Sequence, residues 1–188
     1  MKKVGILALQ GAFREHIQMI KSLGHQAIEI RNVSQLNDID GIILPGGEST
    51  AIGKLLKDFS IAQTLINKIN NGLPVWGTCA GMILLAKELD GDENAHLKVM
   101  DIKVRRNAYG TQLDSFATTG VVREVSEKEI PMVFIRAPYI VDIDESVDVL
   151  YKLDRNIVAA RQKNMLVTSF HPELTDDKSF HQYFINMM

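Results

Sequence analysis

One cysteine stands between two glycines in the segment Gly77-Thr78-Cys79-Ala80-Gly81, and this segment constrains the fold more than any other part of the chain. The apolar residues Pro74–Gly77 lead into it and the helical run Met82–Lys87 follows, so the pattern predicts a strand that turns sharply into a helix. Glycines suit both flanks because a side chain there would crowd the bend. The cysteine would then lie at the tip of the turn, where the positive end of the helix favours the nucleophilic thiolate.

A partner for Cys79 is present near the end of the chain. The apolar stretch Met165–Phe170 ends in His171-Pro172-Glu173. Residues two apart in extended chain point to the same side, so Glu173 could orient the His171 ring. His171 would act as a base toward Cys79 and later as an acid. We therefore predict a Cys79–His171–Glu173 triad, in a chain order that differs from the Ser, Asp, His order of α/β-hydrolases.

Each of these residues also has a purely structural interpretation. A lone cysteine is usually a small buried apolar residue, and a His-Pro pair after a strand is usually a turn. The elbow glycines combined with a histidine and a carboxylate favour the catalytic interpretation. The remaining histidines are expected mostly at surface positions, and none has a second ligand at a spacing that predicts a metal site: His16, His25, His96 and His181.

Length and charge narrow the class of protein. A chain of 188 residues suits one domain, residues 1–188, with a sizeable core. A net charge of −2 gives no indication of binding to nucleic acid or to a membrane. One cysteine cannot form an internal disulfide, the apolar N-terminal stretch lacks a cleavage site, and no apolar run reaches membrane-spanning length. We expect a cytoplasmic protein.

Strand and helix signals alternate through the first half of the chain. Continuously apolar strands separated by helices indicate a parallel sheet covered on both faces. From about residue 97, short apolar runs between polar turns suggest antiparallel strands, some extending the main sheet and others forming a small second one. The predicted fold is therefore α/β, with three layers, a mostly parallel central sheet flanked by helices, and a small antiparallel extension. The strands predicted in the parallel part are Val4–Leu9, Ala27–Ile30, Gly41–Leu44 and Pro74–Gly77.

A helix is expected to close the chain. Thr175 is the candidate N-cap, and Asp176 and Asp177 would complement the helix dipole. An apolar stripe at helical spacing is expected to pack in the core rather than against a partner: Phe180, Tyr183, Phe184 and Met187.

The motifs together resemble those of class I (triad) glutamine amidotransferases. The cysteine elbow and the His-Pro-Glu segment indicate this broad group. Within it the chain resembles the family of glutaminase subunits of pyridoxal 5′-phosphate synthase. That closer resemblance rests on five further segments: Leu7–His16, Leu44–Thr50, Arg105–Gly110, Phe134–Pro138 and Ser169–Thr175.

The resemblance implies a reaction and a partner. L-glutamine would be hydrolysed to glutamate and ammonia through a γ-glutamyl thioester. The ammonia would pass to a separate synthase (lyase) subunit, which builds pyridoxal 5′-phosphate from a pentose phosphate and a triose phosphate. No cofactor is expected in this chain, because pyridoxal phosphate would form on the other subunit. The resemblance assigns substrate contacts to Gly47, Glu48, Ser49, Arg106, Ile135 and Arg136.

The expected site chemistry follows from these assignments. Glu48 would bind the α-ammonium of glutamine and the two arginines its α-carboxylate, although Glu48 could also be an acid at a helix start. The backbone N–H of Ala80, by the logic of the elbow, and that of Gly47, by the resemblance, would bind the oxyanion. We further expect the Gly46-Gly47 peptide to flip when the synthase docks, with Gln10 on the same rim as a candidate interface residue.

Two other functions remain open. A cysteine-dependent hydrolase similar to the DJ-1/PfpI group would keep the fold but act on peptides or reactive carbonyls. A catalytically idle regulatory subunit would keep the fold without the chemistry. The candidate pocket arginines favour an amino-acid amide over the first, and the complete triad gives no support to the second. Rapid labelling of Cys79 by iodoacetamide at neutral pH would indicate an activated thiol.

Overall fold

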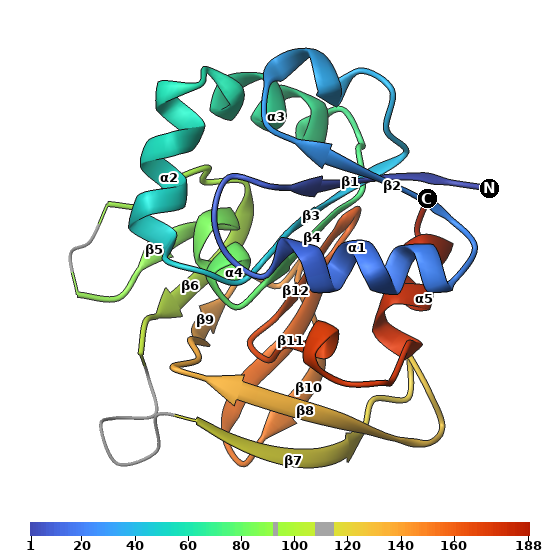
Figure 1. The fold of residues 1–188 in the computed structure, drawn as a ribbon. Helices are drawn as coiled ribbons and strands as arrows, with labels where there is room; N and C mark the ends of the chain where they lie inside the picture. The colour runs from blue at the N-terminus through green and yellow to red at the C-terminus, as the bar shows by residue number, and fades with distance from the viewer. Residues whose placement is uncertain (92–93, 108–114) are drawn as a thin grey trace.

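The computed structural model describes residues 1–91, 94–107 and 115–188 and contains a large mixed sheet (Figure 1). In the part of the chain described, this sheet has ten strands in the order β2-β1-β3-β4-β12-β11-β9-β6-β5, with β10 paired to β11. Strands β7 and β8 form a separate two-stranded sheet, seen at the bottom of Figure 1. Within the same ranges, no helix is long and apolar enough to cross a membrane.

The bounds of the elements are as follows. The strands are β1 (Lys3–Leu7), β2 (Gln26–Ile30), β3 (Gly41–Leu44), β4 (Val75–Thr78), β5 (Ala86–Leu89), β6 (Met100–Arg105), β7 (Ser115–Val121), β8 (Glu129–Ile135), β9 (Tyr139–Ile143), β10 (Asp148–Leu153), β11 (Asn156–Gln162) and β12 (Met165–Thr168). The α-helices are α1 (Phe13–Ser22), α2 (Ser49–Asp58), α3 (Ile61–Asn70), α4 (Ala80–Leu85) and α5 (Ser179–Asn186), and the 3₁₀ turns are η1 (Val33–Leu36) and η2 (Pro172–Leu174).

The parallel half of the sheet is buried on both faces. Strand β1 pairs in parallel with β2 and β3, β3 with β4, and β4 with β12. Alternate residues of β3 belong to different cores: Ile42 and Leu44 join the cluster of α2, α3 and α4, whereas Ile43 joins that of α1, α5 and β8. This alternation explains why the strands are continuously apolar, as predicted for a parallel sheet with helices on both faces.

The antiparallel half extends the same sheet beyond β12. Strand β11 is antiparallel to β12, β9 and β10, and β6 is antiparallel to β9. Together with the separate β7–β8 pair, this confirms the predicted three-layer α/β fold with an antiparallel extension. One local prediction was wrong: the helix expected over Met82–Lys87 ends at Leu85, and Ala86 begins a short strand, β5, that pairs with β6.

The C-terminal helix begins later than predicted. Thr175 was expected to cap it, but α5 starts at Ser179. The Thr175 hydroxyl instead donates to the carbonyl oxygen of Pro172 at 3.0 Å, which closes η2, and Asp177 accepts from the Ser179 N–H at 2.8 Å. The apolar stripe does pack in the core, and its first and third members, Phe180 and Phe184, are fully buried.

Candidate active site

The carboxyl ends of four parallel strands meet at one edge of the sheet. The loops after β1, β3, β4 and β12 carry Gln10, the Gly46-Gly47 pair, Cys79 and His171, respectively. In an open α/β sheet this edge is where ligands bind. The topology therefore brings together residues that lie up to 161 positions apart, from Gln10 to His171.

Cys79 lies between β4 and α4 in the predicted strand–turn–helix arrangement. Its backbone has φ 49° and ψ −102°, a conformation that side chains disfavour. A Cβ atom at Gly77 would lie 2.5 Å from the backbone of Gly81, and one at Gly81 would lie 2.0 Å from the carbonyl oxygen of Leu44. A side chain at either position would clash with neighbouring backbone, and this explains why the elbow motif has glycine at both.

His171 and Glu173 lie beside the cysteine. His171 Nδ1 is 2.7 Å from Glu173 Oε1, and the histidine ring packs against the Cα atom of Gly46, where a Cβ would come within 2.4 Å of it. Burial lowers the pKa of His171, but hydrogen bonds to Cys79 and Glu173 and their negative charges outweigh burial and raise it to about 10. The imidazolium form of His171 is therefore favoured in its position between Cys79 and the Glu173 carboxylate. Cys79, His171 and Glu173 have the arrangement of a nucleophile, its base and the group that orients the base.

A pocket of about 560 Å³ opens above Cys79. Apart from Glu173, which lies behind His171, all the predicted site residues line it: Gly47, Glu48, Ser49, Cys79, Ala80, Arg106, Ile135, Arg136 and His171. The Ser49 hydroxyl is buried and has no hydrogen-bond partner among the described residues, so it can serve a bound ligand. The pocket has the size and the mixture of apolar and charged groups that suit a small amino acid.

Glu48 also has the structural role that the sequence left open. Its carboxylate caps α2 by accepting from the backbone N–H groups of Thr50 at 3.0 Å and Ala51 at 2.6 Å. Burial raises the pKa of Glu48, but these bonds and the nearby Arg106 together outweigh burial and lower the pKa below its usual value. Arg106 Nη2 lies 3.5 Å from Glu48 Oε1. The two charges expected to bind the ends of glutamine therefore face each other in the free protein.

Ile135 and Arg136, at the end of β8, also line the pocket. The Ile135 carbonyl oxygen is 3.9 Å from Cys79 Sγ, so Ile135 meets the site through its backbone. Arg136 has a positive φ of 43°. The tail of the Arg105–Gly110 motif, from residue 108 onward, lies outside the described residues.

Two loops clasp each other at the rim. The carbonyl oxygen of Gly46 accepts from the N–H of Ala12 at 3.0 Å, and Gln10 Oε1 accepts from the N–H of Glu48 at 2.8 Å. Gly11 has φ +103°, and a Cβ there would lie 1.9 Å from Gly46 O. The rim position of Gln10 was expected, but the bond from Ala12 could not be found from the sequence because it depends on how the β1 and β3 loops meet.

The expectation that the remaining histidines lie at the surface was wrong. His16 and His181 are fully buried, and His25 and His96 are partly buried. His16 is on the same face of α1 as the core residue Ile20, and its ring nitrogens are satisfied by polar neighbours. A sequence pattern of apolar residues misses such a position because a histidine is read as polar.

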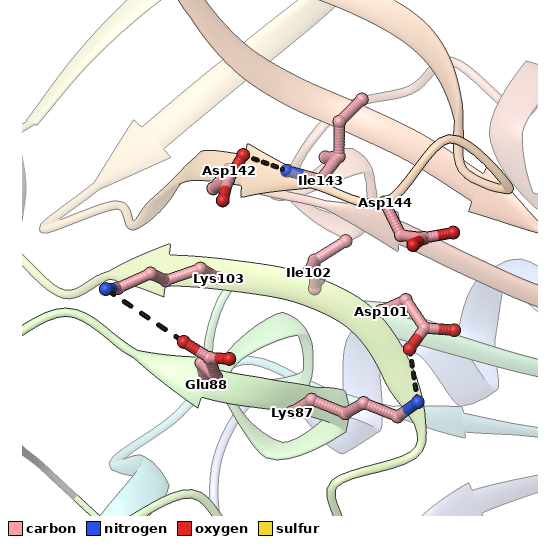
Figure 2. Close-up of a pocket in the computed structure, with 8 residues that line it drawn as sticks. All are labelled: Lys87, Glu88, Asp101, Ile102, Lys103, Asp142, Ile143 and Asp144. Atoms are coloured by element: carbon pink, nitrogen blue, oxygen red, sulfur yellow. Dashed lines mark hydrogen bonds and ion pairs between the residues drawn. The ribbon is translucent and has the colours of Figure 1, made fainter.

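A second hollow of about 280 Å³ lies over β5, β6 and β9 (Figure 2). Figure 2 shows Lys87 paired with Asp101, and Lys103 directed toward Glu88, where the two charged groups are 4.0 Å apart. Its cations are thus already paired with neighbouring carboxylates, and none of the predicted site residues lines it. The predicted site residues gather instead at the pocket above Cys79.

Known proteins resemble this chain over nearly its whole length. Residues 6–188 match the SNO glutamine amidotransferase family. The pyridoxal 5′-phosphate synthase subunit PdxT of Clostridium beijerinckii is 56% identical over 183 residues, covering 97% of this chain and 96% of that protein. PdxT of Ruminiclostridium cellulolyticum is 53% identical over 189 residues and covers 100% of both chains.

Solved structures show the same fold. A crystal structure of a glutamine amidotransferase superposes with a TM-score of 0.93 at 44% identity, covering 98% of this chain and 97% of that chain. PurLQS from Thermotoga maritima, at 17% identity and a TM-score of 0.73, shares the fold over 99% of each chain. The family match and the two curated relatives cover nearly the whole length of the protein, and the chain belongs to the SNO glutamine amidotransferase family.

Proposed function

We propose that this chain, acting as a single cytoplasmic domain over residues 1–188, hydrolyses L-glutamine and supplies the ammonia to a pyridoxal 5′-phosphate synthase subunit. The observation that carries the proposal is the placement of Cys79, His171 and Glu173 beneath a pocket with charged walls. The relatives named as synthase subunits match this chain almost end to end, which supports the identity of the acceptor.

In the first half of the reaction, Cys79 Sγ attacks the side-chain amide carbon of glutamine. The C=O electron pair moves onto oxygen, giving a tetrahedral oxyanion. His171, which holds a proton between Cys79 and Glu173, gives it to the nitrogen as the C–N bond breaks, and ammonia leaves. A γ-glutamyl thioester remains on Cys79.

In the second half, the neutral His171 removes a proton from water. The hydroxide attacks the thioester carbon, and collapse of the second oxyanion releases glutamate and the Cys79 thiolate, with the proton back on His171. Backbone N–H groups of Ala80 and Gly47 stabilise both oxyanions. Loss of one such donor typically lowers the rate about 10²- to 10³-fold.

The charged groups of the pocket account for recognition of an amino acid. The planar guanidinium groups of Arg106 and Arg136 suit the α-carboxylate, and Glu48 suits the α-ammonium. Because Arg106 and Glu48 already face each other at 3.5 Å, a zwitterion that inserts between them would satisfy both charges.

Substitution of Arg106 tests this assignment. In Arg106→Ala the α-carboxylate loses its partner, so KM for glutamine should rise about tenfold or more, as expected for loss of a charge-assisted bond. Steady-state rates over a range of glutamine concentrations, from below KM to saturation, measure the effect. Arg155→Ala, at an exposed arginine outside the pocket, is the control. An unchanged KM would remove Arg106 from the substrate site.

The rim loops support control of the site by the partner. Since the Gly46 carbonyl is bonded to the Ala12 N–H, turning the Gly46–Gly47 peptide requires that bond to break. We propose that docking of the synthase subunit at the rim, where Gln10 lies, breaks this bond. The Gly46–Gly47 peptide then turns so that the Gly47 N–H points toward the oxyanion. Glutamine would then not be consumed when no acceptor is present.

The test is glutamate release from L-glutamine by the chain alone and with the synthase subunit, with Cys79→Ala as control. Strong stimulation by the partner, abolished in Cys79→Ala and accompanied by formation of pyridoxal phosphate, is the expected result. Glutaminase activity that ignores the partner would contradict the proposed acceptor. Absence of activity in both conditions would contradict the glutaminase mechanism.

A further inference from the structure

A buried polar cluster lies behind Glu173, on the side away from the substrate pocket. His16 from α1 and His181 from α5 are both fully buried, with His16 Nδ1 2.9 Å from His181 Nε2. His16 Nε2 lies 3.3 Å from Thr78 Oγ1 and 3.5 Å from Glu173 Oε2. The histidines do not line the pocket above Cys79, so they have no part in binding the substrate directly.

The positions of the ring protons follow from the neighbours. His181 Nδ1 has no hydrogen-bond partner among the described residues. If His16 donated to His181, the single proton of neutral His181 would be on that unpartnered nitrogen. A buried N–H donor without a partner costs more free energy than a buried acceptor without one. If His181 donates from Nε2 to His16 Nδ1, only an acceptor is left unpartnered. The proton of His16 is then on Nε2, directed toward Glu173 and Thr78.

Glu173 needs such a donor. One of its oxygens is bonded to His171, but Oε2 accepts no hydrogen bond of normal geometry within the described ranges, and the side chain is fully buried. Removal of a carboxylate from water favours its protonated form, in which it could no longer stabilise the His171 cation. Burial raises the pKa of Glu173, but its neighbours, among them the hydrogen bond and the positive charge of His171, outweigh burial and lower the pKa. Burial also lowers the pKa of His16, although Glu173 opposes this, so His16 acts as a neutral donor.

The histidine pair is held rigidly by Trp76. The Trp76 ring makes edge contacts with His16 at 5.6 Å and His181 at 4.9 Å between centroids. Trp76 is itself anchored by a hydrogen bond from Nε1 to Thr168 Oγ1 at 3.2 Å. A ring enclosed in this way cannot rotate to another partner, so the direction of the His16 donor is set by packing.

We propose that His16, fixed by His181, is a positioning residue that keeps Glu173 ionised and aligned with His171. The ordered set His181–His16–Glu173–His171–Cys79 then extends the triad to α1 and α5. The inference rests on the proposed triad function, and it adds two buried residues that act only through Glu173.

Two amide variants test the proposal because they differ in reach. Glutamine can place its N–H₂ near the position of His16 Nε2, whereas asparagine reaches only the Nδ1 position beside His181. For His16→Asn we expect kcat for glutamine hydrolysis to fall about 10- to 100-fold, the range seen when an outer partner of a site residue is lost, with KM within about twofold. Iodoacetamide labelling of Cys79, the only cysteine, should slow several-fold. His16→Gln should recover most of the wild-type kcat and most of the labelling rate.

The controls separate a positioning role from a structural one. Gln162→Asn shortens another buried, hydrogen-bonded side chain by one methylene, at a residue that does not line the pocket above Cys79, and should change stability but neither kcat nor labelling. Equal loss in His16→Asn and His16→Gln, or wild-type kcat in both, would overturn the proposal. If His16→Asn does not fold, His181→Phe retains the ring but removes the donor to His16. It should lower kcat without changing KM, and unchanged kcat there would also overturn the proposal.

The same assay distinguishes failure of the triad from failure of this inference. Cys79→Ala is measured alongside, in the complex with the synthase subunit. Activity in Cys79→Ala would contradict the proposed function itself. An inactive Cys79→Ala together with wild-type behaviour of His16→Asn would leave the triad in place and exclude the role of His16.

Discussion

Cys79 is held in a backbone conformation that glycine adopts readily and other residues do not. With φ 49° and ψ −102°, its Cβ is crowded by its own backbone, at a cost of about 1–3 kcal/mol. The surrounding contacts of β4, α4 and β3 maintain this geometry, which holds the thiol beside the base and the Ala80 N–H. The strain at Cys79 thus lowers the free energy of unfolding of the protein, and the same conformation orients the proposed nucleophile.

Replacement of Cys79 by two inert residues measures this strain. Cys79→Gly and Cys79→Ala should both be inactive, but the glycine variant should be more stable by about 1 kcal/mol because glycine relieves the strain. Urea denaturation compares the free energies of unfolding. Ala95→Gly, outside the helices and strands, provides a control for the entropy that glycine adds to the unfolded state. A glycine variant less stable than the alanine variant would show that the conformation is not strained.

The charge state of His171 predicts how stability changes with pH. Its folded-state pKa is raised from about 6.5 to about 10, so its contribution is fully present below about pH 6.5 and is lost as pH rises through about 10. The difference in unfolding free energy between the wild type and His171→Asn should therefore shrink across this range. Denaturation at several pH values measures it, with His25→Asn as control. A difference that grows with pH would contradict the imidazolium assignment.

At the scale of elements, the elbow depends on how closely α4 approaches β3. A Cβ at Gly81 would lie 2.0 Å from the Leu44 carbonyl oxygen, so Gly81→Ala must displace α4 from the sheet. We expect destabilisation of about 2–4 kcal/mol, typical of overpacking, together with loss of activity. Gly24→Ala is the control, since Gly24 has φ +79° and open space around it, and should cost only about 1 kcal/mol. Urea denaturation measures the free energy of unfolding of each variant, and similar decreases for the two variants would contradict the steric argument.

The same element shows what the sequence could and could not predict. The apolar run after Cys79 predicts a helix, and the helix forms, but nothing local indicates that it stops at Leu85. Residues Ala86–Leu89 are extended because β6 offers them backbone partners, a contact made by distant residues. The start of α5 was missed for a similar reason, since Thr175 caps a turn of its own before the helix begins.

The site residues likewise divide into those with a local sequence signal and those placed only by distant contacts. Cys79, His171 and Glu173 stand in motifs whose chemistry is readable without the fold, and so their meeting could be predicted. His16 and His181 carry no local signal, because each becomes meaningful only when α1 and α5 pack against Trp76 on one face of the sheet. A pattern of apolar spacing assigns polar residues to the surface, and therefore cannot find a buried polar pair.

At the scale of the whole molecule, the site is assembled where four parallel strands end, and its most adjustable part is the clasp between the β1 and β3 loops. Gln10 Oε1 holds the Glu48 N–H at 2.8 Å, directly after the Gly46-Gly47 pair. In the proposed mechanism, a partner that contacts the rim would turn the Gly47 N–H by displacing these loop bonds, without moving the sheet that carries Cys79 and His171. Control of the reaction can therefore be confined to one loop.

Removal of the clasp should uncouple activity from the partner. Gln10→Ala removes one of the two bonds that hold the loop carrying Gly47 and leaves only the Ala12–Gly46 bond, so the Gly46–Gly47 peptide turns more readily in the isolated chain. Glutamate release without the synthase subunit should rise several-fold, and the stimulation by the partner should fall by a similar factor, because coupling through one equilibrium is shared between the two. Gln63→Ala, on the exposed face of α3, is the control and should leave both values unchanged. Unchanged basal activity in Gln10→Ala with full stimulation would mean that the rate is set elsewhere than at this loop, and that the partner acts on His171 or on the substrate instead.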